Sequence, residues 1–91
     1  MFINRKKVAW CPECEQGWIE IAKDLDTGEL FCCCDECMCE WNDPNNITPQ
    51  TVVACAKRGI WGKACDPTDE EIATKGWQKF IIHEYQGHRI D

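Results

Sequence analysis

The first half of the chain alternates apolar and polar residues in a way that predicts a β-hairpin. Residues 18–22 read WIEIA, the pattern of a strand with one buried face. Residues 24–28 (DLDTG) have the composition of a turn, and residues 29–34 (ELFCCC) return as a second strand. We therefore expect an antiparallel hairpin with a pair of cysteines near each end of it.

The second half of the chain predicts two short helices. Thr48 is a candidate N-cap, with Pro49 at the first helical position and Gly59 as a stop signal. Residues 68–71 (TDEE) form a capping box that begins the second helix. The pattern over residues 77–85 fits neither the helical nor the strand period cleanly, and we interpret it as a strand added to the sheet.

These elements predict one α+β domain over residues 1–91. A small antiparallel sheet with a cysteine-rich part at residues 8–46 would be followed by a helix-and-strand extension at residues 47–91 that packs on it. A chain this short buries only about 60–65% of the surface that its unfolded state exposes, so its fold needs stabilisation by a cross-link such as a disulfide bond or a bound metal. Large aliphatic residues are few, and several of the five tryptophans must therefore supply core area.

The nine cysteines indicate that this cross-link is either a set of disulfide bonds or a bound metal. Residues 1–10 lack the apolar run of a signal peptide, and no stretch of the chain is long enough to span a membrane. We therefore expect a cytoplasmic protein whose thiols stay reduced. An odd number of cysteines also fits complete pairing poorly, so metal is the better interpretation.

Two C-x-x-C pairs separated by 19 residues predict a metal site. Each pair delivers two sulfur atoms to one side of a tetrahedral zinc ion, and the hairpin between the pairs brings them together. Four thiolates close the coordination shell, so we expect one structural Zn²⁺ ion rather than a catalytic one. The predicted ligands are Cys11, Cys14, Cys34 and Cys37.

Residues 10–41, which contain both pairs, resemble a zinc ribbon. The resemblance covers about a third of the chain and implies that the four cysteines are ligands on two knuckles at the end of a β-hairpin. Ribbon knuckles often have glycine directly after the second cysteine, where the backbone turns with positive φ. Glu15 and Met38 occupy those positions here, so each knuckle must accept a side chain there.

The crowded cysteines leave alternatives open for the second pair. The second pair of ligands could instead be Cys33 with Cys37, or Cys37 with Cys39. The pair of Cys34 with Cys37 keeps the two-residue gap that closes a knuckle best. Iron in the same site would make a rubredoxin-like electron carrier, because four thiolates also suit iron. The remaining cysteines are expected to act as small apolar residues: Cys32, Cys33, Cys39, Cys55 and Cys65.

The sequence does not predict an enzyme. The chain has no serine, and His83 and His88 stand one residue too far apart for an H-E-x-x-H motif. We interpret both histidines as surface residues. A second metal site that combines them with Cys39, Cys55 or Cys65 has no supporting spacing.

The charge distribution favours a protein partner. Residues 11–46 hold ten acidic residues and one lysine, a net charge of −9, and four thiolates with a divalent ion add a formal −2. Such a lobe suits a basic protein surface, because complementary charge speeds association and fixes orientation. The predicted contact residues lie beside the ligands: Glu13, Asp35, Glu36 and Glu40.

Small size, acidity and the lack of a catalytic apparatus are similar to bacterial toxin-immunity proteins. This resemblance is to a functional type rather than to a motif, and it implies a basic toxin nuclease domain as the partner. A nucleic-acid-binding ribbon is the alternative, and it would use Lys57, Arg58 and Lys63 near Trp61. The acidic residues beside the ligands would repel phosphate, so we expect nucleic acid less, and we expect no membrane partner.

Overall fold

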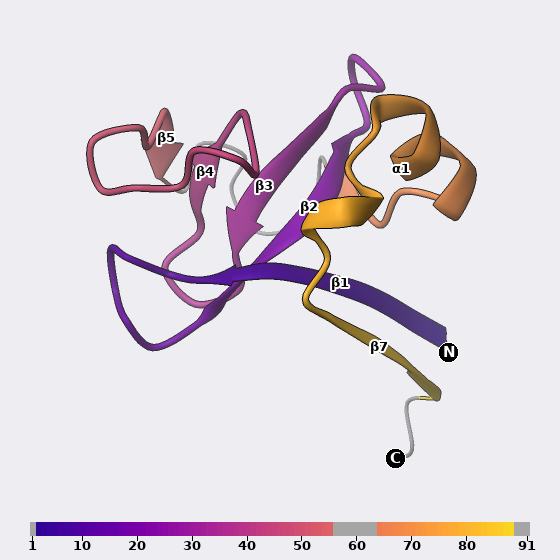
Figure 1. The fold of residues 1–91 in the computed structure, drawn as a ribbon, viewed down its shortest axis with the longest axis horizontal. Helices are drawn as coiled ribbons and strands as arrows, with labels where there is room; N and C mark the ends of the chain where they lie inside the picture. Colours follow the sequence, from indigo (N-terminus) through magenta and orange to yellow (C-terminus); the bar gives the residue numbers. More distant parts are fainter. Residues whose placement is uncertain (1, 56–63, 89–91) are drawn as a thin grey trace.

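The hairpin predicted from the alternating pattern forms the centre of an antiparallel sheet (Figure 1). The computed structural model describes residues 2–55 and 64–88. Over these residues the sheet has seven strands in the order β5-β4-β3-β2-β1-β7, and β6 pairs with β2 outside this path. The elements are β1 (Phe2–Trp10), β2 (Trp18–Asp24), β3 (Leu30–Cys34), β4 (Cys39–Trp41), β5 (Ala54–Cys55), β6 (Ala64–Cys65), α1 (Asp69–Lys75), the 3-10 helix η1 (Gln78–Phe80) and β7 (His83–His88).

The core lies between one face of the sheet and helix α1. Ile21, Cys32 and Trp41 form a cross-strand row on this face, and none of them is more than 2% exposed. Ile72 of α1 and Trp77, which follows the helix, belong to the same buried cluster. Tryptophan therefore supplies core area at positions 41 and 77, as the shortage of aliphatic residues predicts.

The prediction of a helix that starts at Thr48 is wrong for residues 48–55, the part of this segment that the structure describes. The Thr51 N–H donates to the Thr48 carbonyl at 3.1 Å, and the Thr48 N–H donates to the Thr51 hydroxyl at 2.9 Å, which makes a tight turn. The indole of Trp41 also donates to the Thr48 carbonyl, at 2.9 Å. These local bonds compete with helix formation, and the chain continues into strand β5 instead. Gly59, the predicted stop, lies outside the described residues.

The second predicted helix is confirmed together with its capping box. The Thr68 hydroxyl accepts from the Glu71 N–H at 3.1 Å, and the Glu71 carboxylate accepts from the Thr68 N–H at 2.8 Å. Helix α1 ends at Gly76, which adopts the left-handed conformation with φ 78°. Among the described residues, neither helix is long and apolar enough to cross a membrane.

The prediction of a strand over residues 77–85 is confirmed only for its last part. The chain forms η1 directly after Trp77, so the first part of the segment is helical. Strand β7 follows and pairs antiparallel with β1, from Phe2↔His88 to Lys7↔His83. The short 3-10 turn explains why the apolar residues here follow neither regular period.

One pair of cysteines is joined, contrary to the prediction that the thiols stay reduced. Cys39 of β4 lies opposite Cys55 of β5, and their sulfur atoms form a disulfide bond. The prediction missed this pair because it placed residue 55 in a helix rather than in a strand beside β4. Cys32 stays a free thiol, and burial raises its pKa to about 12, so it acts as a small apolar residue in the core.

Candidate metal centre

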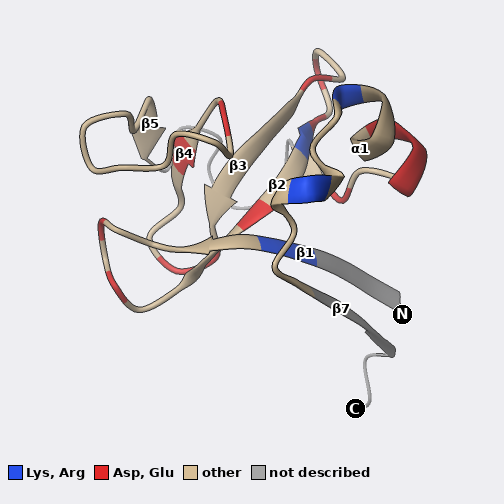
Figure 2. Ribbon diagram, viewed as in Figure 1, with Lys and Arg blue, Asp and Glu red and all other residues tan. Residues whose placement is uncertain are grey.

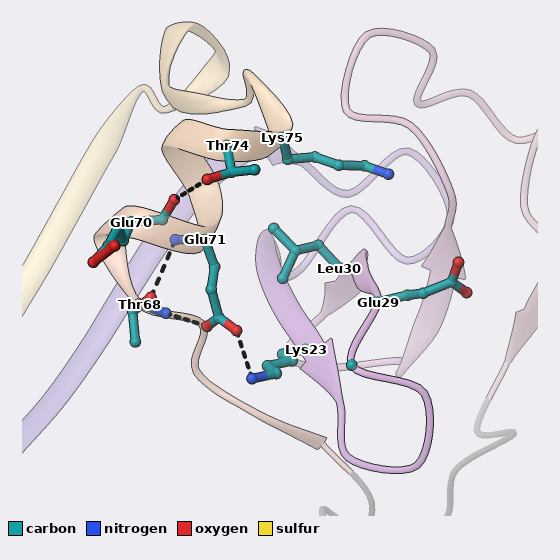
Figure 3. A pocket seen from close by; sticks show the side chains of 9 residues that line it. Lys23, Glu29, Leu30, Thr68, Glu70, Glu71, Thr74 and Lys75 are labelled. Carbon is teal, nitrogen blue, oxygen red and sulfur yellow. Dashed lines mark hydrogen bonds and ion pairs between the residues drawn. The ribbon is translucent and has the colours of Figure 1, made fainter.

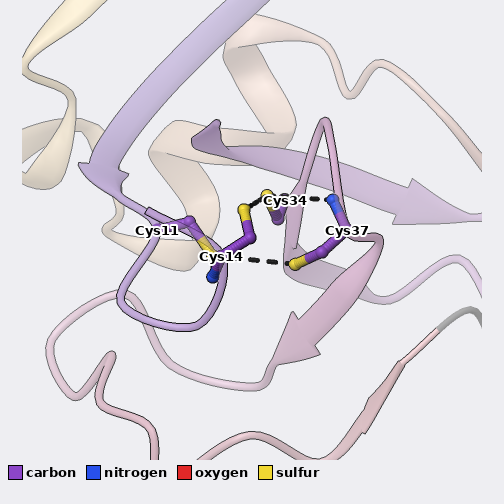
Figure 4. A group of neighbouring side chains, drawn as sticks. All are labelled: Cys11, Cys14, Cys34 and Cys37. Carbon is purple, nitrogen blue, oxygen red and sulfur yellow. Dashed lines mark hydrogen bonds between the residues drawn. The ribbon is translucent and has the colours of Figure 1, made fainter. Parts of the chain in front are cut away.

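Two turns at one end of the sheet bring four cysteines together. The turn of residues 11–17 joins β1 to β2 and carries Cys11 and Cys14, whereas Cys34 ends β3 and Cys37 lies in the turn that leads to β4. Because β1, β2 and β3 run antiparallel, both turns fall at the same end. We call these two turns the knuckles. Figure 4 shows the four side chains gathered between them.

The four sulfur atoms form a cluster of the size that a tetrahedral metal ion requires. Cys11 Sγ lies 3.7 Å from Cys37 Sγ, and Cys14 Sγ lies 3.6 Å from Cys34 Sγ. All four atoms lie within 4.8 Å of one another. Sulfur ligands about 2.3 Å from a tetrahedral zinc ion would stand about 3.8 Å apart. The cluster predicted from the C-x-x-C spacing is therefore present, and it could bind a metal.

Backbone N–H groups of both knuckles point at the sulfur atoms. Cys11 Sγ lies 3.5 Å from the Cys14 N–H nitrogen that donates to it. Cys34 Sγ accepts from the Glu36 N–H at 3.3 Å and from the Cys37 N–H at 3.4 Å. Hydrogen bonds of this kind favour the charged form of a sulfur ligand. Each C-x-x-C turn is thus shaped to hold thiolates.

At part of the site, burial raises the pKa of the thiols and so opposes the hydrogen bonds, which lower it. A hydrogen bond from the Gln16 backbone lowers the pKa of the Cys14 thiol, whereas burial raises the pKa of Cys34 and of Cys37 above the usual value. A coordinated cation reverses the effect of burial, because a thiol bound to a metal ion loses its proton outright. The donor set therefore fits a cation such as zinc.

The two positions that ribbon knuckles often give to glycine have positive φ in this chain. Glu15 has φ 52° and Met38 has φ 61°, and each directly follows the second cysteine of its knuckle. The expectation that both turns accept a side chain there is confirmed. A residue with a Cβ pays about 1–2 kcal/mol for this conformation.

Replacing Glu15 with glycine should therefore leave the metal-loaded chain equally stable or stabilise it by up to about 1 kcal/mol. Relief of the left-handed strain offsets the larger entropy that glycine gives to the unfolded chain. Gln16→Gly is the matched control, because Gln16 is also exposed and has no positive φ. It should destabilise by about 0.5–1 kcal/mol. Thermal unfolding of both variants tests this, and equal losses in the two would contradict it.

Gly17 is the residue of the site that the sequence analysis missed. Its carbonyl accepts from the Cys11 N–H at 2.9 Å and so closes the first knuckle. A Cβ atom on Gly17 would lie 2.9 Å from Cys34 Sγ and 2.5 Å from Asp35 Oδ1. The two knuckles therefore touch at this glycine, where a side chain does not fit. A glycine between a C-x-x-C turn and a strand is the signal that could have indicated it.

The four predicted contact residues differ in their exposure. Glu13 and Glu36 are exposed on the knuckles. The Asp35 carboxylate is partly buried and accepts from the Trp18 N–H at 3.0 Å, which ties the second knuckle to β2. Glu40 is only 3% exposed, so its prediction as a surface contact is wrong. It lies in β4, whose three residues are all buried and show no alternation that sequence could reveal.

An open pocket between α1 and the β2–β3 turn is lined by acidic and basic side chains and by none of the four clustered cysteines (Figure 3). The Glu71 carboxylate there forms an ion pair with Lys23 while it also caps α1 at Thr68. Hydrogen bonding between the two side chains lowers the pKa of Glu71 and raises the pKa of Lys23. These paired charges join α1 to β2, and we assign them a structural role.

The comparisons with known proteins found no match. No model of a protein family matches the chain, and no curated protein or solved structure matches it. The cluster of four sulfur atoms and the surface around it are therefore the observations from which a function can be argued.

Proposed function

We propose that this chain is a non-enzymatic protein-binding module of the zinc-ribbon type, stabilised by one structural zinc ion. The observation that carries the proposal is the cluster of four sulfur atoms, held on two knuckles whose exposed side chains include Glu13 and Glu36. A site closed by four cysteines leaves no open position for a substrate, so the ion supplies stability rather than chemistry. The surface around the site is then free to serve binding.

The knuckle end of the sheet is suited to a basic protein partner. Figure 2 shows acidic residues on both knuckles. Residues 11–46, which include them, hold ten acidic residues and one lysine, and the metal with its four thiolates would add further negative charge. Electrostatic complementarity of this kind steers a basic surface toward the knuckles and raises the association rate.

The specific form that we propose is an inhibitor of a basic nuclease, such as the toxin that an immunity protein neutralises. Carboxylates on the knuckles would occupy the positions of substrate phosphates at a cationic active site. Such a protein needs a rigid acidic surface and no catalytic group of its own. The short turns that hold the metal would supply that rigidity.

Nucleic acid binding is the alternative, and the described surface does not favour it. The exposed carboxylates Glu13 and Glu36 would repel phosphate at the end of the sheet where a ribbon makes contact. The basic residues that could compensate, Lys57, Arg58 and Lys63 beside Trp61, lie outside the described residues. Binding of DNA or RNA by the metal-loaded chain at physiological salt, with an affinity that falls as the salt concentration rises, would overturn the proposal.

Reversing the charge of Glu13 and Glu36 together should slow association with the partner on the order of tenfold, because electrostatic steering is lost. The partner is first captured from the native host with the metal-loaded chain, and rates are then measured at several salt concentrations. Glu29→Lys is the matched control, since Glu29 is exposed in the β2–β3 turn, away from the knuckles. Metal content and melting temperature should not change in any variant.

Metal analysis of the same protein separates zinc from iron. A colourless protein with one equivalent of zinc would support the proposal, whereas a red protein that titrates reversibly would identify an electron carrier. Equal association rates and equal salt dependence in the charge-reversed variant would place the partner interface elsewhere on the molecule.

A further inference from the structure

An aromatic pair stands where the first knuckle leaves the sheet. Trp10 ends β1 and Trp18 begins β2, so the two residues lie opposite each other at the base of the 11–17 turn. Their rings meet edge to face, with centroids 5.0 Å apart and an angle of 77° between the planes. We call Trp10 and Trp18 the tryptophan pair. Trp10 is 48% exposed, whereas Trp41 is completely buried in the core.

The tryptophan pair already attracts a cation from its own chain. Lys7 Nζ lies 5.5 Å from the centroid of the Trp18 ring. The face of an indole ring carries partial negative charge and binds cations more strongly than the other aromatic rings do. The exposed ring of Trp10 offers the same property to a second molecule.

Two exposed glutamates follow Trp10 in the sequence, on the turn that the tryptophan pair closes. Glu13 and Glu15 are both exposed within the 11–17 turn. A hydrogen bond closes this turn, in which the Cys11 N–H donates to the Gly17 carbonyl at 2.9 Å. A guanidinium group can stack on an indole while its N–H groups donate to a carboxylate, and an ammonium group does this less well. The chemistry of the surface therefore matches arginine better than lysine.

Resting on the proposed protein-binding function, we propose that the exposed ring of Trp10 receives an arginine side chain of the basic partner. The guanidinium group stacks on the indole, and the carboxylates of Glu13 and Glu15 accept its hydrogen bonds. Tryptophan and arginine are the residue types that most often dominate the energy of protein interfaces. Trp10 is thus the anchor of the interface, and the acidic residues of the 11–17 turn steer and orient the partner.

Two peptides test the proposal without knowledge of the partner. One contains several arginines separated by glycine and serine, and the other has lysine in place of every arginine. The zinc-loaded full chain should bind the arginine peptide more tightly, on the order of fivefold. Trp10→Leu keeps an apolar side chain but removes the aromatic face, and it should abolish this preference. Leu25→Ala is the control, because Leu25 is 55% exposed in the turn at the other end of the hairpin.

Calorimetry gives the affinities, and the indole N–H resonance of Trp10 reports contact at the ring itself. A shift of this resonance by the arginine peptide, with the Trp41 resonance unmoved, would support the proposal. If Trp10→Leu retains the preference for arginine while Glu13→Lys abolishes binding, the arginine site is wrong and the proposed function stands. If neither peptide binds in low salt, both proposals fail. Zinc content and circular dichroism show whether each variant is folded.

Discussion

A strong chelator is expected to unfold the reduced chain and to abolish its cooperative thermal transition. Zinc binding to four thiolates is worth about 10–16 kcal/mol, and a whole small domain is stable by only about 5–15 kcal/mol. Cys11 and Cys34 are 0% exposed and belong to the core cluster, so loss of the ion also disturbs the core. Circular dichroism melts before and after chelation, with metal analysis of both samples, measure the effect. A reductant prevents the Cys39–Cys55 disulfide from holding β4 to β5 during the experiment.

Single substitutions identify the ligands in the same assay. Cys11→Ser and Cys37→Ser should each lose the metal and unfold, because three thiolates bind it far less tightly. Cys65→Ser is the matched control, since Cys65 is an exposed free cysteine outside the cluster. Cys33→Ser tests the alternative register and should keep one equivalent of metal. A chelated chain that still melts cooperatively would show that the metal does not hold the fold.

Sequence spacing was sufficient to predict the sulfur cluster because the relevant information is local. A C-x-x-C turn places two sulfur atoms on one side whatever surrounds it, and the alternating pattern identified the hairpin that brings the two turns together. The positive φ at Glu15 and Met38 follows from the same local geometry. The capping box at Thr68 was equally predictable, since its bonds join residues only three apart.

The features that sequence missed begin with a turn at Thr48, and they continue with contacts that this turn allows between distant segments. Thr48 has the signals of a helix N-cap, but its carbonyl accepts from the Trp41 indole and its N–H donates to Thr51, so a turn replaces the helix. That change places Cys55 in a strand beside β4 and allows its disulfide with Cys39. Glu40 is also buried, and its strand β4 pairs with β5, the strand that the sequence analysis placed in a helix.

Gly17→Ala is expected to destabilise the metal-loaded chain by about 3 kcal/mol and to weaken its hold on the metal. The added Cβ would lie 2.5 Å from Asp35 Oδ1, 2.8 Å from Glu36 Cγ and 2.9 Å from Cys34 Sγ. The Glu36 side chain is exposed and can move aside. The other two atoms cannot move freely, because Asp35 accepts from the Trp18 N–H at 3.0 Å and Cys34 belongs to the cluster of four sulfur atoms.

Gly28→Ala separates this clash from the ordinary effect of replacing glycine. Gly28 has φ 77° and no atom within 4 Å of an added Cβ, so alanine there should cost only about 1–2 kcal/mol of left-handed strain and should not affect the metal. Denaturant unfolding gives the two stabilities, and competition with a chromophoric chelator gives the two metal affinities. Equal metal affinity in both variants would mean that the knuckles do not meet at Gly17. Weaker affinity in Gly17→Ala alone would show that contact between the knuckles positions the sulfur atoms for the ion.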